Sequence, residues 1–235
     1  MLKLVRMEWK KNRIGTYVRA AVILAALLAA FLFALAFLGI AVDPVTGVVD
    51  AAPGHNAISS SIELFTGMVY LVFTGVMLSA FIVSSYKNKT VDLMFSYPIK
   101  RQKILASQML AVWLFCFAAL ALTKLLLYGC ILTGSRFFQS AFLLDFDMGS
   151  PGFYLQLLLK SATIVTMGFI ALFVGLTLKS SKATIICSFL LIFLTQANIG
   201  DLSMANSTVF PIVLTAVSLV FALLSVSRAE QKDLM

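Results

Sequence analysis

The feature that most constrains the fold of this chain is a succession of long apolar stretches, several of which reach the length of a membrane-spanning helix. A helix needs about 20 predominantly apolar residues to cross the hydrocarbon core of a bilayer. Hydrophobic residues make up 61% of the 235 residues and charged residues only 12%, whereas a soluble domain carries about 25% charged residues. The polar surface is too small for a water-soluble globule, and the sequence predicts an all-α, polytopic membrane protein.

The apolar stretches predict six transmembrane helices, at about 19–42, 61–85, 104–132, 153–178, 184–199 and 208–227. The fifth is short and ends in the polar run Thr195-Gln196-Ala197-Asn198. We therefore expect it either to cross incompletely or to turn back within the membrane. The first stretch is longer than the 7–15 apolar residues typical of a signal peptide, so it is expected to be retained as a span. Residues 18–235 would form one six-span transmembrane domain.

The positive charges predict the orientation of the chain. If both termini face the same side, 15 of the 18 Lys and Arg residues lie on that side, and the opposite loops hold only Arg136. Lys124 and Lys160 fall inside predicted spans. Because cytoplasmic segments carry the excess of Lys and Arg, we predict a multi-pass protein of the cell membrane with both termini in the cytoplasm. This distribution also argues against nucleic-acid binding, despite the net charge of +8.

Residues 1–17 are predicted to form an amphipathic helix lying in the inner membrane interface. At about 100° per residue, apolar and basic side chains separate to opposite faces of the segment MLKLVRMEWKKNR. The residues that would carry this role are Leu2, Val5 and Trp9 on the apolar face and Lys10 and Arg13 on the basic face, next to anionic lipid headgroups. The alternative is a positively charged leader that only sets topology.

The segment SSYKNKTVDLMFSYPIKRQKILASQML, residues 84–110, interrupts the apolar pattern. Asn88 or Thr90 can cap a short helix, and Asp92 in its first turn would interact favourably with the helix dipole. Pro98 stops that helix and suits the first turn of the next. The short helix would expose apolar side chains that need a partner surface; the alternative is an ordinary loop whose apolar side chains rest on the membrane.

The stretch VDLMFSYPIKRQKILASQML resembles the loop between the second and third spans of ABC-2 type transporter permeases. In that family a leucine-rich short helix precedes Tyr-Pro-(Ile/Val)-(Ser/Lys)-Arg, and a basic interfacial helix precedes the first of six spans. Gln108 departs from this pattern, since many members carry lysine there. The resemblance implies a cytoplasmic coupling segment at about 88–103, whose contacts with an ATPase subunit would come from Thr90, Val91, Asp92, Leu93, Met94, Phe95, Ser96, Tyr97, Pro98, Lys100 and Arg101.

The same resemblance implies the function and partners of the chain. It would be the permease subunit of an exporter, paired with a second permease chain as a homodimer or heterodimer and with two copies of a cytoplasmic ABC ATPase. The chain contains no Gly-x-x-x-x-Gly-Lys-(Ser/Thr) sequence, which cradles nucleotide phosphates in P-loop proteins. ATP and Mg would therefore be bound by the partner subunit, with no cofactor in this chain. The cargo expected is hydrophobic or amphipathic, a peptide before a lipid or a drug.

The alternatives are an intramembrane enzyme and a self-contained channel or secondary carrier. The sole histidine, His55, lies in a predicted outer loop, which argues against histidine-rich metal sites, and no hydrolase motif is present. Secondary carriers usually have internal repeats with broken spans at matching positions, and none is visible here. We therefore expect no catalytic site and no metal site.

Polar residues within the predicted spans are the candidates for a transport pathway. A lysine at the bilayer centre costs at least about 2.5 kcal/mol, so Lys124 and Lys160 are expected either to snorkel outward or to face the pathway. In the pathway they would pair with Glu63, Asp145 or Asp147, or meet an anionic part of the cargo. Glu63 could instead cap the N-terminus of its span, where a carboxylate interacts favourably with the helix dipole. Gln196 and Asn198 either bond neighbouring helices or line an outer gate.

Overall fold

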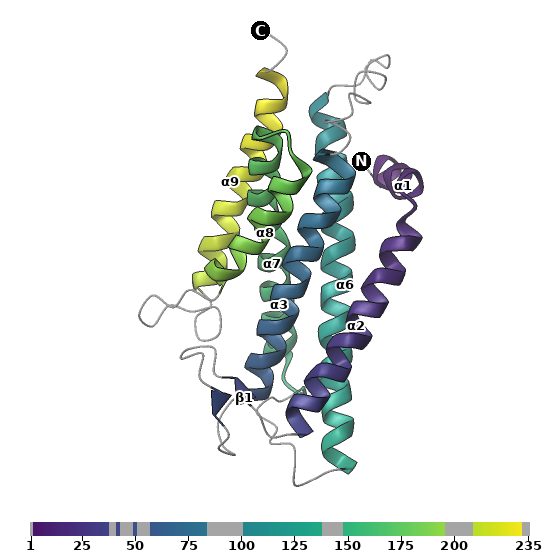
Figure 1. Ribbon diagram of the computed structural model, residues 1–235, viewed down its shortest axis with the longest axis vertical. Coiled ribbons are helices and arrows are strands. Elements are labelled where there is room, and N and C mark those ends of the chain that lie inside the picture. The colour runs from purple at the N-terminus through teal and green to yellow at the C-terminus, as the bar shows by residue number, and fades with distance from the viewer. Residues whose placement is uncertain are drawn as a thin grey trace.

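The computed structural model describes residues 2–37, 41–42, 49–50, 57–83, 101–137, 148–195 and 209–231. Apart from one pair of two-residue antiparallel strands, β1 (Ala41–Val42) and β2 (Val49–Asp50), the secondary structure of these residues is helical. The helices form an elongated bundle (Figure 1). The predicted all-α class is confirmed.

The helices follow one another up and down the bundle. They are α1 (Leu2–Lys11), α2 (Ile14–Phe37), α3 (Ala57–Leu78) with the π-helical turn η1 (Ser79–Val83), α6 (Arg101–Phe137), α7 (Pro151–Thr177), α8 (Ser181–Thr195) and α9 (Val209–Gln231). Successive long helices alternate in direction, so that α1, the start of α6 and the end of α9 lie at the same end of the bundle (Figure 1). We call this the basic end, because it carries the exposed side chains of Arg6, Lys10, Lys11, Arg13, Arg19, Lys103, Lys179 and Lys182.

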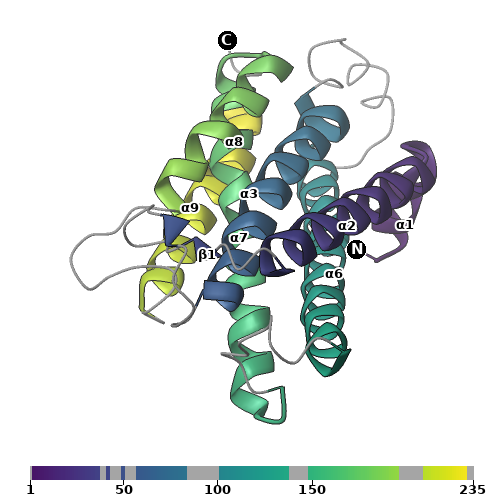
Figure 2. The same ribbon diagram turned by 60° about the horizontal axis from the view of Figure 1, so that its bottom comes forward.

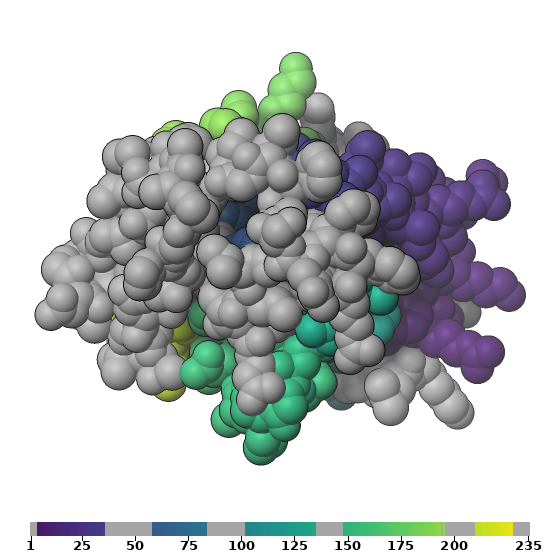
Figure 3. All heavy atoms as spheres, turned by 90° about the horizontal axis from the view of Figure 1, so that it is seen from below, coloured from purple at the N-terminus to yellow at the C-terminus, as the bar shows by residue number. Residues whose placement is uncertain are grey.

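Within the described residues, five helices are long and apolar enough to cross a membrane: α2, α3 with η1, α6, α7 and α9. The remaining predicted span corresponds to α8, whose apolar part covers only Ser181–Phe193. Five of the six predicted spans therefore meet this criterion, and α8 is short, as its sequence indicates. At the end opposite the basic end, the last turns of α6 and the first turns of α7 lie next to each other (Figure 3), with the rings of Tyr128 and Phe153 4.9 Å apart.

Several helix boundaries differ from those predicted. The first helix ends at Lys11 rather than near residue 17, and α2 already begins at Ile14. The break is at Arg13, whose φ of 48° is left-handed and incompatible with a continuous helix. α6 extends over 37 residues, beyond the apolar stretch 104–132 at both ends. Hydropathy marks the part of a helix that contacts hydrocarbon, whereas helical hydrogen bonds continue through the polar residues on either side.

A second left-handed residue, Lys179 with φ 49°, separates α7 from α8. The Ser180 N–H donates to the Gly175 carbonyl at 3.2 Å, and the Leu178 N–H donates to the Val174 carbonyl at 3.0 Å. The first of these is the long bond of a Schellman motif, which satisfies carbonyls at a helix C-terminus. The chain therefore reverses direction at the basic end within a few residues.

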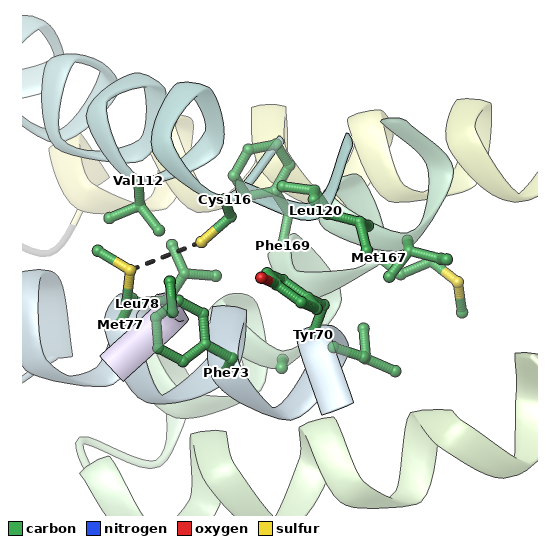
Figure 4. Close-up of a cluster of buried hydrophobic side chains, with 14 of the residues drawn as sticks. Tyr70, Phe73, Met77, Leu78, Val112, Cys116, Leu120, Met167 and Phe169 are labelled. Carbon is green, nitrogen blue, oxygen red and sulfur yellow. Dashed lines mark hydrogen bonds between the residues drawn. The ribbon is translucent and has the colours of Figure 1, made fainter. Parts of the chain in front are cut away.

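The core lies where α3 meets α6 and α7. The cluster in Figure 4 joins Tyr70, Phe73 and Met77 of α3 to Val112, Cys116 and Leu120 of α6 and to Met167 and Phe169 of α7. In contrast, α2 packs on α6 and α9 packs on α7 at the outside of the bundle (Figures 1 and 2). Only 22% of the apolar window of α2 and 28% of that of α9 are buried, against 72% for α3. Exposed apolar faces of this size are unfavourable in water and are compatible with contact to lipid tails.

Small residues set the closest helix contacts around α3. A Cβ built at Gly75 would lie 1.9 Å from the Ser188 Oγ of α8, and one built at Gly168 of α7 would lie 2.7 Å from the Thr74 Cγ2 of α3. Ser79, one turn beyond Gly75, donates from its Oγ to the Ser181 carbonyl at 3.1 Å. Small residues allow helix backbones in membranes to approach closely, and these contacts fix α3 against α7 and α8.

Candidate functional site

An ion pair between α6 and α3 lies inside the helix bundle. The Lys124 Nζ lies 2.7 Å from the Glu63 Oε2 and donates a hydrogen bond to it. The Lys124 side chain is fully buried, and that of Glu63 is 19% exposed. A charge this deep is costly unless it is paired, so the two residues hold each other in place. Snorkelling of Lys124 is excluded, and pairing with Glu63 is the arrangement that the structure shows.

The structure also decides the position of Glu63 within its helix. Since α3 begins at Ala57, the first turn contains no acidic residue. Glu63 therefore lies beyond the turn where a carboxylate gains most from the helix dipole, and the interpretation that it serves the N-terminus of the span is wrong. The reason is that polar residues, including Ser59 and Ser60, extend the helix ahead of the apolar stretch.

Lys160 of α7 lies within about one helical turn of the level of Glu63. α3 and α7 run in the same direction (Figure 1), and their register follows from two contacts, Gly67 with Ile164 and Thr74 with Gly168. One helical turn before Gly67 is Glu63, and one turn before Ile164 is Lys160. Lys160 also acts on Lys124 electrostatically as a like charge. We call Glu63, Lys124 and Lys160 the charged cluster.

The side of α7 on which Lys160 lies faces the bundle. Its neighbours at one turn before and one turn after, Leu157 and Ile164, are buried at 3% and 2% exposure, whereas Leu155 and Leu158 are exposed. Lys160 itself is half-buried. No acidic group of the described residues lies within ion-pair distance of it; Asp145 and Asp147, two partners that the sequence suggests, lie outside those residues.

A second polar contact ties α3 to α6 next to the charged cluster. The Tyr70 hydroxyl and the Thr123 Oγ1 share a hydrogen bond of 2.5 Å, and both side chains are buried. Thr123 directly precedes Lys124, and Tyr70 lies two turns from Glu63 on the same helix. Two polar contacts thus hold these helices together in the half of the bundle away from the basic end.

The N-terminal helix α1 packs on α6 through a polar contact that the sequence did not suggest. The Glu8 carboxylate is buried and accepts hydrogen bonds from the side-chain amides of Gln108 and Asn12, both at 3.4 Å. The Trp9 indole N–H donates to the Ala111 carbonyl at 3.0 Å. The side of α1 that faces α6 carries buried Val5 and Glu8 and half-buried Trp9 and Asn12, spaced i, i+3, i+4 and i+7.

The predicted faces of α1 are therefore partly confirmed. Val5 and Trp9 lie on the packed face and Lys10 and Arg13 are exposed, but the apolar face contacts α6 rather than only lipid. The side chain of Leu2 is outside the described set. Glu8 could have been suspected as the sole acid in a basic segment, placed one turn after Val5 on the apolar side.

Most of the predicted ATPase-coupling residues cannot be placed. Thr90 to Pro98 and Lys100 belong to residues 84–100, which lie outside the described part of the chain. Arg101 begins α6. Gln196 and Asn198 also lie outside it, just after α8. Among the described residues, no group of three or more His, Cys, Asp or Glu side chains is arranged to hold a metal ion.

The bundle as a whole defines the class of this protein: a helical bundle with five helices long and apolar enough to cross a membrane among its described residues, and with an ion pair buried between α3 and α6. No family model matches the chain, and no solved structure matches it. The chain is similar to "Uncharacterized protein YcbO" of Bacillus subtilis (strain 168), with 25% identity over 244 aligned positions that cover 99% of this chain and 100% of the relative. The similarity thus spans the full bundle.

Proposed function

We propose that this protein is the membrane-spanning permease subunit of an ATP-driven exporter of the ABC-2 type. It moves a hydrophobic or amphipathic molecule, a peptide before others, out of the cell. Two such chains form the pathway, and two copies of a cytoplasmic ATPase subunit bind ATP and Mg and supply the energy.

The observation that carries this proposal is the concentration of cations at the basic end. Exposed basic residues of α1, the start of α6 and the α7–α8 turn all lie there. Since positive charge favours the cytoplasmic side, the basic end is assigned to the cytoplasm. Val83 and Arg101, the described residues that flank the segment with Tyr97-Pro98, end η1 and begin α6 at this same end, which is the end that a cytoplasmic ATPase could reach.

A second candidate function is a self-contained channel or secondary carrier. The buried ion pair of Lys124 and Glu63 favours it, because ionisable residues inside a membrane often mark a path for ions or substrates. A permease for lipid or drug efflux is a variant of the first proposal, and the exposed apolar residues of α2 and α9 suit such a cargo equally well.

Co-purification from native membranes in mild detergent tests the proposal. We expect an ATPase subunit to accompany the wild-type chain and to be lost from the variant Leu93→Asp/Phe95→Asp, which replaces two apolar residues of the proposed contact segment by carboxylates. Lys179→Asp is the matched control, because it adds an acid at the exposed α7–α8 turn of the same end. If no ATPase accompanies the wild type under conditions that preserve known transporter complexes, the channel or carrier becomes the better hypothesis.

A further inference from the structure

We propose that the charged cluster of Glu63, Lys124 and Lys160 binds an acidic group, a carboxylate or a phosphate, of an amphipathic molecule. This inference rests on the proposed function insofar as that molecule is the exported cargo. It names the chemistry that the cargo would present at the half of the bundle away from the basic end.

The first step is the charge balance of the cluster. It contains two ammonium groups and one carboxylate, and Glu63 is already 2.7 Å from Lys124. The described residues of α6 and α7 contain no Asp or Glu, and Glu63 is the acid of α3. The cluster thus carries an excess positive charge among neutral side chains of α3, α6 and α7, and one monovalent acidic group would balance it.

The second step is access. Lys124 is fully buried behind the ion pair, so an incoming molecule cannot reach it first. Lys160 is half-buried on the inward side of α7, between Leu157 and Ile164, and the Glu63 side chain keeps 19% of its surface exposed. An acidic head would therefore meet Lys160, while its chain could lie along Phe153, which is half-buried two turns before Lys160 on the same side of α7.

The third step is the role of the ion pair. The Glu63 carboxylate accepts a hydrogen bond from Lys124 of α6 at 2.7 Å. An ammonium that donates to an ionised acceptor forms one of the stronger hydrogen bonds in proteins. Lys160 is thus left with donors for an acidic ligand rather than for Glu63, and Glu63 would repel a second anion.

The test uses the full chain purified in neutral detergent, without any ATPase. The probes are myristoyl-lysophosphatidylglycerol, which carries an ionised phosphate, and monomyristoylglycerol, which has the same acyl chain and no acidic group. Binding is followed by thermal unfolding during titration. We expect the anionic probe to bind the wild type more tightly, and Lys160→Gln to weaken it roughly tenfold, the loss of one charged hydrogen bond. Lys160→Arg should retain the preference, and so should the control Lys182→Gln at the basic end.

Two further arms complete the test. Inorganic phosphate alone should not stabilise the protein at concentrations that saturate the anionic probe, since the proposal requires an amphipathic ligand; stabilisation by phosphate would assign a free-anion site instead. Equal binding of both lipids, or an unchanged preference in Lys160→Gln, would overturn the inference and favour snorkelling of Lys160. Because no ATPase is present, these outcomes are independent of the co-purification result.

Discussion

The close approach of α3 to α8 at Gly75 yields a steric prediction that can be worked through atom by atom. At Gly75 of α3, an added Cβ would meet the Ser188 side chain of α8 at 1.9 Å to Oγ and 2.6 Å to Cβ. Carbon atoms in contact normally lie about 3.5–4.0 Å apart. The hydroxyl can rotate away, but the Ser188 Cβ is fixed to the backbone. Gly75→Ala therefore requires α3 and α8 to separate by roughly 1 Å, taken from these separations.

Overpacking of this kind typically costs about 1–3 kcal/mol. We expect Gly75→Ala to lower the free energy of unfolding by that amount, measured by thermal or denaturant unfolding in detergent. Adding Ser188→Ala should not rescue it, because the 2.6 Å approach to Cβ remains. Adding Ser188→Gly should rescue most of it, because the facing Cβ is gone.

The matched control is Gly129→Ala in α6, where an added Cβ meets nothing within 4 Å. Alanine favours a helix over glycine by about 1 kcal/mol, so this variant should be neutral or slightly stabilising. Rescue of Gly75→Ala by Ser188→Ala would show that only the hydroxyl was in the way, and equal stability of Gly75→Ala and wild type would show that α8 does not approach α3 as described.

Three other residues lead to predictions that unfolding experiments check in the same way. Lys124→Met should cost about 3–5 kcal/mol, because it leaves the largely buried carboxylate of Glu63 unpaired. Adding Glu63→Gln should recover most of the loss, and an additive double variant would contradict the ion pair. Gln108→Leu should cost about 1–3 kcal/mol of unfolding free energy, because it removes an amide donor to the buried Glu8 carboxylate of α1. In a Trp113→Phe background it should also shift the fluorescence of Trp9 to longer wavelength, and an unchanged spectrum would contradict docking of α1 on α6. Lys179→Gly should raise stability by roughly 0.5–1 kcal/mol, since glycine adopts the left-handed conformation without a Cβ penalty, and a decrease would show that the lysine side chain contributes more than the strain.

The sequence predicts the outline of this fold well, because the bilayer imposes a simple rule on composition. A helix that contacts lipid must be apolar for about 20 residues, so α2, α3, α6, α7 and α9 could each be recognised from hydropathy alone. The shortness of α8 was visible for the same reason. Gly75 and Ser79 are small residues four positions apart, a spacing typical of close helix packing in membranes, but the sequence does not identify α8 as their partner.

Contacts between helices could not be predicted, since they depend on how the helices rotate about their axes. The sequence offered several partners for Lys124, and only the positions of α3 and α6 select Glu63. The contact of Glu8 with Gln108 joins residues 100 positions apart. It was missed because a single acid in a basic segment looks like part of a charged surface.

Membrane helices resemble one another in their apolar residues, so the few buried ionisable residues hold most of the information that distinguishes one bundle from another. Burying each such residue costs free energy, and the hydrogen bond or ion pair that it forms with a partner offsets this cost. Glu8 has the amides of Gln108 and Asn12, and Lys124 and Glu63 have each other. Lys160 lies on the inward side of α7 and forms no ion pair within the described part of the chain. A bound acidic ligand could therefore offset the free-energy cost of burying the Lys160 ammonium. A substitution of Lys160 that abolishes ligand binding would indicate a transport pathway, and one without effect would indicate a bundle that binds no such ligand.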